Sequence, residues 1–571
     1  MKTYETDVLV VGGGGAATAA TISAHDHGAR TAMAVKGRFG VPGARGAGAT
    51  SNPLAEFWTI RTVGKKGGFF NPPDKVLADM VQTGLGMADP KLCGIFVDEV
   101  SDAIKRLHSM GMRFQSKMLA TMPATDESKG TNNIVLIQKA VIEGTNTDVL
   151  EQANLTDILV EDGEVVGAVG VDDEGEPFLV HAKSVVLATG GVGQLFQYSF
   201  NPPGNTGDGY AMALRAGAEL FNMEFMQQGL ATTWPTQAII MLYDMDEPYR
   251  LYNANGKTFI EDYLPEGISL EQVSKEKAAH WPVSCRDTSV HLDRAIHGEA
   301  LAGRATPHDG VFLDISGTRR DFMPEAFYNH MLKCGLDIDR DLLQVQIHHH
   351  TSNGGVRIDE RAQSRIRGLF VVGETAGWQG ADRLGGTMLG GSQVFGWRAG
   401  ETAAAVAKNH SEKRASQSTI DRALEPIAKF GEQPGTHDIR DMKTKMQRHM
   451  WEKLLVEKDA KTLDDVRTFI AEERERLSNV KRQSNFDTVL MCEHRAMLDV
   501  AEVITEAATF RTESRGAHYR SDFPDRNDAE WTTNVFATRD ADGKLALSKR
   551  WINEDVGWEE DPKGVRISPW G

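Results

Sequence analysis

The sequence is poor in cysteine and has no long apolar run. Its four cysteines (Cys93, Cys285, Cys334 and Cys492) include no CxxC pair. This excludes a disulfide scaffold and an iron–sulfur cluster held by this chain alone, and it fits a reducing compartment. No stretch approaches the roughly 18 apolar residues of a membrane-spanning helix. The opening MKTYETDVLVVGGGG lacks the basic end and apolar core of a signal peptide. We therefore expect a cytoplasmic protein without a membrane span.

Basic residues are also scarce relative to acidic ones. The chain has 63 lysines and arginines against 80 aspartates and glutamates, so its formal net charge at pH 7 is −17. Such a charge argues against a nucleic-acid partner, because nothing here would neutralise a phosphate backbone. A length of 571 residues exceeds one ordinary core and predicts roughly two to four domains.

What the sequence does contain is a glycine turn between two predicted strands. The apolar run at 8–11 is typical of a buried parallel strand. It leads into Gly12-x-Gly14-x-x-Ala17, an alanine-rich helix and a second strand at 31–35. Gly12 permits a tight turn, Gly14 lets the backbone approach a pyrophosphate, and Ala17 keeps the helix close to the strand. The helix N-terminus would supply free N–H groups and a positive dipole end for phosphates.

The same domain is predicted to return later in the chain. Strand patterns recur at 165–171, 184–187 and 368–372, and a helix is predicted through 394–407. One doubly wound α/β domain assembled from separated segments explains these patterns better than several unrelated domains. The insertion between about 226 and 344 is mixed in character and is predicted to form a second domain.

Beyond the polar stretch at 408–419 the pattern changes to helical stripes. Met442, Met446 and Leu454 fall on one apolar stripe, and further stripes follow up to residue 507. We predict a bundle of three helices over about 437–510, with these stripes as its core. The rest of the chain is predicted to be rich in loops.

The stretch QIHHHTSNGG (346–355) raises the question of a metal site. Side chains alternate on an extended strand, so His348 and His350 would share one face while His349 points away. An H-x-H pair can begin a zinc site, but no third ligand is evident. We therefore predict no metal here and interpret His348 and His349 as packing residues.

Motifs spread over most of the chain carry a resemblance to a known family. They are VVGGGGAATAA (10–20), ATGG (188–191), NTGDGYAMALRAGAELFNMEFMQ (205–227), CRD (285–287), HTSNGGVRID (350–359), GLFVVGETAGWQGADRLGGTMLGGSQVFGWRAG (368–400) and ESRGAHYRSDFPDRND (513–528). In this order and spacing they resemble the flavoprotein subunits of the fumarate reductase/succinate dehydrogenase family, whose relatives include L-aspartate oxidase and the adenylylsulfate reductase α subunit.

The resemblance implies a fold and a division into domains. We expect an α/β protein with a Rossmann-like doubly wound FAD-binding domain (1–225 and 345–408) and an inserted α+β capping domain (226–344). A C-terminal helical bundle (420–515) and a loop-rich tail (516–571) would follow.

The resemblance also implies FAD in an extended pose. The residues expected around it are Gly12, Gly14, Gly15, Ala17, Lys36, Ala47, Gly48, Ala188, Thr189, Asp208, Glu374, Met388 and Leu389. The GARGAGA loop (43–49) would let backbone lie close to a flat ring. Asp208 would contact the flavin region, Glu374 the ribityl chain, and Met388 and Leu389 the isoalloxazine ring.

The activity implied by the resemblance is hydride transfer between the flavin and a C=C or CH–CH bond beside a carboxylate. Such chemistry needs a cation to clamp the carboxylate, donors for the developing charge, and an acid. Arg383 in ADRLGG matches the clamping arginine, His350 the donor beside it, and Arg286 of CRD the proton donor. Adjacent Asp287 would orient Arg286. Because its pKa exceeds about 12, arginine is a poor acid, so this role rests on the resemblance alone.

The sequence departs from the family where a second carboxylate would bind. Gly229 stands at the position of a family histidine, and AIIML (238–242) has no polar pair where the family has Thr-Glu. Gln379 and Asp382 replace a histidine and an asparagine of the clamp loop. We therefore expect an enoate or enone, or its saturated form, rather than a C4-dicarboxylate. Its apolar remainder would lie near Gly229 and Met241.

Two other interpretations stay open. A sulfur-metabolism flavoenzyme like the adenylylsulfate reductase α subunit would use a flavin–sulfite adduct, although the retained RLGG loop argues against it. A non-catalytic flavin subunit that only relays electrons would carry the same cofactor motifs. Because no nicotinamide site or cluster is visible, an iron–sulfur electron-transfer subunit is a candidate partner besides the small-molecule substrate.

The sequence predicts that FAD is bound non-covalently. Family members that attach the cofactor do so through a histidine after the second strand, and residues 37–60 contain none. Precipitation with trichloroacetic acid should therefore release the yellow colour into the supernatant. Colour that stays with the protein pellet would contradict this prediction.

Overall fold

The computed structural model describes residues 1–46, 48–51, 59–66, 69–117, 120–123, 132–241, 250–316, 325–409, 413–430, 435–540, 542–552, 559–560 and 566–567. Its largest sheet has seven strands in the order β8–β2–β1–β11–β10–β9, and β18 pairs with β11 off this path. They are β1 (Lys2–Val11), β2 (Thr31–Ala34), β8 (Asp148–Leu150), β9 (Ala153–Glu161), β10 (Glu164–Asp172), β11 (Pro177–Leu187) and β18 (Leu369–Val371).

Segments far apart in the sequence build this sheet. β1 is parallel to β2 and β11, and β18 is parallel to β11, whereas β10 is antiparallel to both of its neighbours, β11 and β9. The N-terminal strand–turn–helix–strand unit is confirmed, and so is the doubly wound α/β fold that unites it with the later strands. All four residues of β2 and the last four of β1 are buried, as their apolar runs predict.

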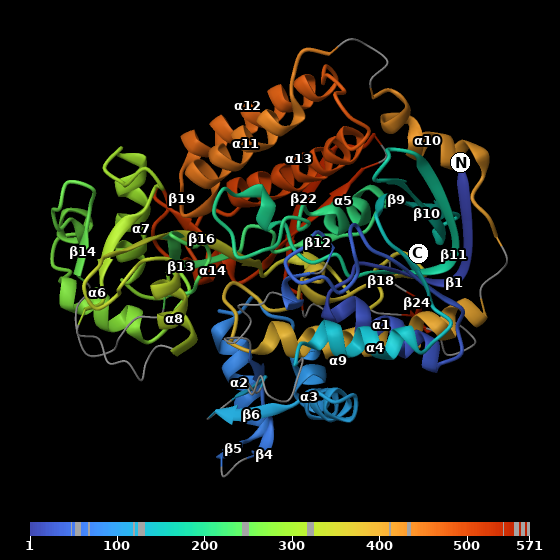
Figure 1. Ribbon diagram of the computed structural model, residues 1–571, viewed down its shortest axis with the longest axis horizontal. Coiled ribbons are helices and arrows are strands. Elements are labelled where there is room, and N and C mark those ends of the chain that lie inside the picture. The colour runs from blue at the N-terminus through green and yellow to red at the C-terminus, as the bar shows by residue number, and fades with distance from the viewer. Residues whose placement is uncertain are drawn as a thin grey trace.

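Helix α1 (Gly15–Asp26) packs closely against α9 (Thr387–Lys408), and α4 (Ile134–Glu143) contacts both helices through Gln138 (Figure 1). A Cβ atom at Gly396 would lie 2.7 Å from the carbonyl oxygen of Ala16, and one at Gly400 would lie 2.3 Å from that of Ala20. Small residues therefore permit a backbone contact that side chains would block. Because α1 begins at the glycine turn, this contact fixes where its N-terminus lies.

The insertion forms a second sheet, β13–β16–β15–β14, drawn at the left of Figure 1. Its strands are β13 (Met226–Trp234), β14 (Arg250–Tyr252), β15 (Val311–Asp314) and β16 (Leu343–Ser352), and its helices are α6 (Leu270–Ala278), α7 (Val290–Leu301) and α8 (Glu325–Lys333). This mixture of helix and strand agrees with the α+β prediction. Where the domains divide stays a prediction.

Three helices cover the top of the molecule in Figure 1 and confirm the predicted bundle. They are α11 (Ile439–Met450), α12 (Ala460–Leu477) and α13 (Asp487–Phe510). Met442, Met446 and Leu454 are all buried, as the stripe predicts. Among the described residues, no helix is both long and apolar enough to cross a membrane.

The C-terminal part contains more regular structure than its loop-rich prediction. Strands β21 (Asn534–Arg539) and β22 (Leu545–Arg550) form an antiparallel hairpin. β21 also pairs with β12 (Leu220–Phe221), so the hairpin extends a small sheet that also contains β17 (Gly355–Val356). Side chains of β22 alternate between partly buried and exposed over its first four residues, which is the period of a half-buried strand.

The α1–α9 contact gives a prediction with a matched control. Gly400→Ala places a methyl group against the Ala20 carbonyl, and overpacking of this kind should lower the free energy of unfolding by about 1–3 kcal/mol. Gly94→Ala, in α3 (Pro90–Ser109), meets no atom within 4 Å and should raise it by about 0.5–1 kcal/mol. Melting temperatures of the two variants should move in opposite directions. A shift of the same sign in both would refute the packing argument.

Candidate functional site

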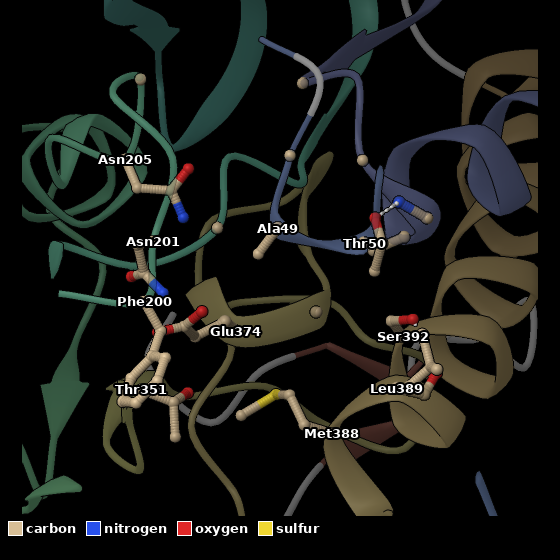
Figure 2. A pocket seen from close by; sticks show the side chains of 18 of the residues that line it. Ala49, Thr50, Phe200, Asn201, Asn205, Thr351, Glu374, Met388, Leu389 and Ser392 are labelled. Carbon is tan, nitrogen blue, oxygen red and sulfur yellow. Dashed lines mark hydrogen bonds between the residues drawn. The ribbon is translucent and has the colours of Figure 1, made fainter. Parts of the chain in front are cut away.

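A cavity of about 920 Å³ opens where the glycine turn, the loop after β11, the start of α9 and the end of β16 meet. In Figure 2, Phe200 and Thr351 lie across it from Leu389 and Ser392, and Glu374 lies on the side of Phe200 and Thr351. The volume is that of a small-molecule site.

Backbone atoms line the cavity at the glycine turn. Gly12 has φ +131°, and a Cβ atom there would lie 2.3 Å from the carbonyl oxygen of Ala188. The N–H group of Gly15 donates to Thr50 Oγ1 at 2.7 Å, at the start of α1 (Figure 2). Gly14 lines the same surface, and a Cβ atom at Gly48 would lie 2.7 Å from its Cα. The result is a cradle of the kind that receives a pyrophosphate at a helix N-terminus.

Other predicted cofactor residues fall around this cradle. Ala188 and Thr189 line the cavity, as do Met388 and Leu389 at the start of α9. Ala17 is fully buried and contributes no surface to the cavity, so its part is in packing α1. The predicted contact at Ala47 lies outside the described residues.

Charged side chains meet at the end of β2. Lys36 Nζ lies 2.6 Å from Asp208 Oδ2 and 3.0 Å from Glu493 Oε1. Burial opposes a charge on Lys36, but these two carboxylates raise its pKa above the ordinary value. Lys36 and Asp208 both line the cavity. Doubly wound folds recognise a ribose at the end of this strand, and the contact of Asp208 with the flavin region stays a prediction.

Glu374 lies in a short 3-10 turn, Gly373–Thr375, facing the cavity (Figure 2). Its Oε1 accepts a hydrogen bond from the backbone N–H of Ser352 at 2.9 Å. A Cβ atom at Gly191 would lie 2.0 Å from the same oxygen, so the glycine leaves room for the carboxylate. Burial raises the pKa of Glu374 to about 7.

At the other end of the cavity, Arg383 and His350 lie together. Arg383 Nη2 is 3.5 Å from His350 Nδ1, and its Nε donates to Gln227 Oε1 at 3.1 Å. Burial lowers the pKa of Arg383 to about 10, so it stays charged at neutral pH. Burial and the nearby guanidinium lower the pKa of His350 well below its usual value, so the imidazole is neutral. The pair presents one cation and one neutral imidazole to the cavity.

An aromatic wall adjoins this pair. The ring of Trp281 lies 4.9 Å from that of His350 and 5.6 Å from that of Phe200, in edge-on contacts. A Cβ atom at Gly229 would lie 2.3 Å from the Trp281 ring, so the indole occupies the space that a side chain at 229 would need. Trp281 and Phe200 line the cavity, and Ile240 lines it in place of the predicted Met241, which is buried elsewhere. Neighbouring residues of an extended segment face opposite ways.

Arg286 does not line the cavity but lies next to the Arg383 loop. Its Nη2 lies 2.6 Å from Asp382 Oδ2, and its Nε donates to Ser284 Oγ at 3.1 Å. Asp287, which we expected to orient it, instead pairs with His280 Nε2 at 3.0 Å. The expectation was wrong because Asp287 lies in a bend and bonds to His280 and to the backbone N–H of Ser289 instead. The aspartate that replaces a family asparagine, Asp382, holds the arginine.

The two remaining histidines of β16 are packing residues. His349 stacks on Phe196 at 5.0 Å, and His348 lies against Tyr198 at 5.2 Å. Burial lowers their pKa values to about 3 and about 4 respectively. Across the described part of the chain, no three His, Cys, Asp or Glu side chains are grouped to hold a metal ion.

Sequence reasoning missed three cavity residues of consequence. Thr50 had no signal, because a threonine in a glycine loop is ordinary. Phe200 and Trp281 are aromatic residues outside any recognised motif. The glycine at 229 was the available clue, since a missing side chain implies that another group fills its place.

Comparisons with known proteins agree with this geometry. A family model for an FAD binding domain matches residues 7–389, and one for the fumarate reductase flavoprotein C-terminal region matches 443–563. An uncharacterized FAD-dependent oxidoreductase of Methanocaldococcus jannaschii is 31% identical over 553 residues, which cover 93% of this chain and 96% of that protein.

Two further proteins are similar over nearly their full lengths. A fumarate reductase (CoM/CoB) subunit of Methanothermobacter marburgensis is 30% identical over 562 residues, covering 94% of this chain and 97% of that protein. The solved structure of Mycobacterium smegmatis Sdh1 in complex with UQ1 has a TM-score of 0.81 at 25% identity, covering 97% of this chain and 96% of that one.

The carboxyl group of Glu374 predicts a pH dependence of the cofactor-free protein. Its pKa is about 7 in the folded state against 4.5 for the free side chain, so the folded state holds the proton more tightly. Its contribution to stability is complete below pH 4.5 and is lost as the pH rises through 7. This decrease in the free energy of unfolding should amount to about 2 kcal/mol, allowing for the partial exposure of Glu374. Glu374→Gln should therefore lose less stability than the parent between pH 5 and 8.

Glu493→Gln serves as the control of opposite sign. Lys36 and Arg45 overcome burial and lower the pKa of Glu493 to about 2, so its charge stabilises the fold at neutral pH. This variant should be less stable than the parent at pH 7. Melting temperatures across the pH range provide the measurement, and parallel profiles for Glu374→Gln and the parent would contradict the assignment.

Proposed function

The chain belongs to the fumarate reductase/succinate dehydrogenase family of FAD-dependent flavoproteins, and we propose that it acts on a C=C or CH–CH bond beside a single carboxylate or carbonyl group. As an FAD-dependent oxidoreductase, it would interconvert an enoate or enone and its saturated form. A C4-dicarboxylate such as fumarate or succinate would be a poor substrate.

The residues present fit FAD. The side-chain-free cradle at Gly12–Gly15 suits a pyrophosphate, and Asp208 and Lys36 at the end of β2 would hold the adenosine ribose. Glu374 would contact the ribityl chain, and Met388 and Leu389 would lie beside the isoalloxazine ring. When bound, FAD supplies or accepts the hydride.

Arg383 and His350 would grip the carboxylate or carbonyl. Of the described residues, none forms an ion pair with Arg383, whose hydrogen-bond partners are the neutral Gln227 and His350. Burial of this cation is costly, the Glu374 carboxylate offsets only part of that cost, and an anionic substrate would offset more of it. Since Arg383 donates toward His350 Nδ1, Nε2 of the neutral ring would carry the hydrogen that stabilises developing charge.

Arg286 is the proposed proton donor. Hydride adds to one carbon of the double bond and a proton to the other, so that C=C becomes CH–CH with no charge left over. Asp382 and Ser284 hold Arg286 beside the loop of Arg383, and its role as proton donor rests on the family resemblance.

The contact between Trp281 and Gly229 would disfavour fumarate relative to bulkier substrates. The Trp281 indole fills the space at Gly229, where family members carry a histidine for the second carboxylate. An apolar ring cannot satisfy a buried carboxylate, so the second anion would be left unpaired.

Electrons would reach the flavin from another protein. Several relatives are named as flavoprotein subunits, including succinate dehydrogenase subunits of Rickettsia species. Together with the lack of CxxC pairs in this chain, this supports an iron–sulfur partner, and we keep the cytoplasm as the expected location.

Anaerobic reoxidation of the reduced flavin by enoates, enones and fumarate tests the proposal. Bulkier enoates should reoxidise the flavin faster than fumarate. Arg383→Gln should slow this reaction at least about 100-fold, because the charged, bidentate clamp is lost. Arg340→Gln, whose parent side chain is 85% exposed, is the control and should react normally.

Three results would contradict the proposal. Fumarate reacting fastest would restore the C4-dicarboxylate assignment. Bleaching of the flavin by sulfite, with no reaction toward enoates, would favour the adenylylsulfate reductase-like alternative. An inert Arg286→Ala change would favour an electron-relay subunit.

A further inference from the structure

We infer that the substrate carries a flat conjugated group, such as an aryl ring, next to its double bond, and that Trp281 selects it. This inference rests on the proposed function and narrows it from enoates in general to arylacrylate-like acids. The feature that supports it is the way in which one indole is fixed against the carboxylate clamp.

Trp281 is held from two sides by β13. Its Nε1 donates to the carbonyl oxygen of Leu230 at 3.4 Å. Two residues further on, the backbone N–H of Val283 donates to the carbonyl oxygen of Gln228 at 2.9 Å. Between these two carbonyls lies Gly229, whose missing side chain lets the ring lie directly on the strand. The indole is therefore a fixed wall, and its orientation depends on glycine at 229.

The aromatic surface of Trp281 and Phe200 extends to His350, which belongs to the proposed carboxylate clamp. His350 makes edge-on contacts with both Trp281 and Phe200, at 4.9 and 5.5 Å between ring centres. A carboxylate at Arg383 would therefore have aromatic surface beside it as soon as the molecule extends beyond the clamp. Rings favour offset or edge-on contact with other rings, and a rigid ring has less conformational entropy to lose than an alkyl chain.

The rest of this end of the cavity agrees with a ring of limited size. Ala238, Ile239 and Ile240 add apolar surface, while Asn329, His330 and Lys333 bring polar groups from α8. A ring on Trp281 would have apolar neighbours along its body and polar groups available to a substituent. A second carboxylate at the distance found in fumarate would meet the apolar part.

The experiment compares trans-cinnamate with 2-hexenoate as oxidants of the anaerobically reduced holoenzyme. The parent should prefer cinnamate by at least about tenfold in second-order rate constant, the scale of one good ring contact. Trp281→Ala should remove this preference by lowering the cinnamate rate, and Trp281→Phe should keep most of it. Trp551→Ala, a change at a 44% exposed tryptophan, is the control and should behave as the parent.

A second variant guards against misfolding of Trp281→Ala. Gly229→Ala leaves the tryptophan in place but puts a methyl group within 2.3 Å of its ring, so the indole must move. The same loss of preference is expected. Binding of 3-phenylpropanoate and hexanoate to the oxidised holoenzyme, followed by the flavin absorbance, should give the same order of affinities without turnover.

The outcomes distinguish a failure of the proposed function from a failure of the aryl assignment. If no enoate reoxidises the parent flavin, the proposed function fails, and the binding measurement alone decides whether Trp281 selects aryl acids. If 2-hexenoate reacts as fast as cinnamate, the aryl assignment fails while the proposed function stands. The aryl assignment also fails if Trp281→Ala or Gly229→Ala lowers both rates or both affinities equally.

Discussion

Close approach between backbones is the constraint on which this molecule depends. At Gly12 a Cβ atom would lie 2.3 Å from the carbonyl oxygen of Ala188, and at Gly400 the same distance from that of Ala20. A strand, a helix and a loop from distant parts of the chain can therefore meet without side chains between them. The glycine turn before α1 presents backbone rather than side chains at their meeting point, so the packing that builds the fold also creates the phosphate cradle. A side chain at Gly12, which also lines the cavity, would act on stability and on ligand binding together.

Charge is distributed differently at the two ends of the cavity. Around Lys36, the carboxylates of Asp208 and Glu493 balance the buried ammonium before any ligand arrives. Arg383 has only neutral hydrogen-bond partners among the described residues; burial lowers its pKa, and the carboxylate of Glu374 offsets only part of that effect. A site whose own charges are balanced can position a ligand of any charge. A buried cation whose charge is only partly balanced favours an anionic ligand. The Lys36 end and the Arg383 end of the cavity therefore differ in their electrostatics.

Local patterns predicted much of this fold, because they depend on neighbours in sequence. The strand at 8–11, the glycine turn and the helical stripes near Met442 all follow from periodicity and turn chemistry. The resemblance to a family supplied Arg383 and His350, which the fold brings within 3.5 Å of each other. What local patterns could not supply were contacts between distant residues. The partner of Arg286 is Asp382 rather than its neighbour Asp287, because side-chain direction depends on tertiary packing.

The pair formed by Gly229 and Trp281 shows why residues carried over one at a time can mislead. A histidine at 229 cannot coexist with this indole, since even a Cβ atom would lie 2.3 Å from the ring. Conversely, removing the indole alone would leave a void against a bare strand rather than a second carboxylate anchor. Specificity at this end is therefore a property of two positions 52 residues apart (229 and 281) that must change together. The three histidines of β16 make the same point in reverse: they look alike in sequence, but only His350 lies where β16, Arg383 and the aromatic wall meet.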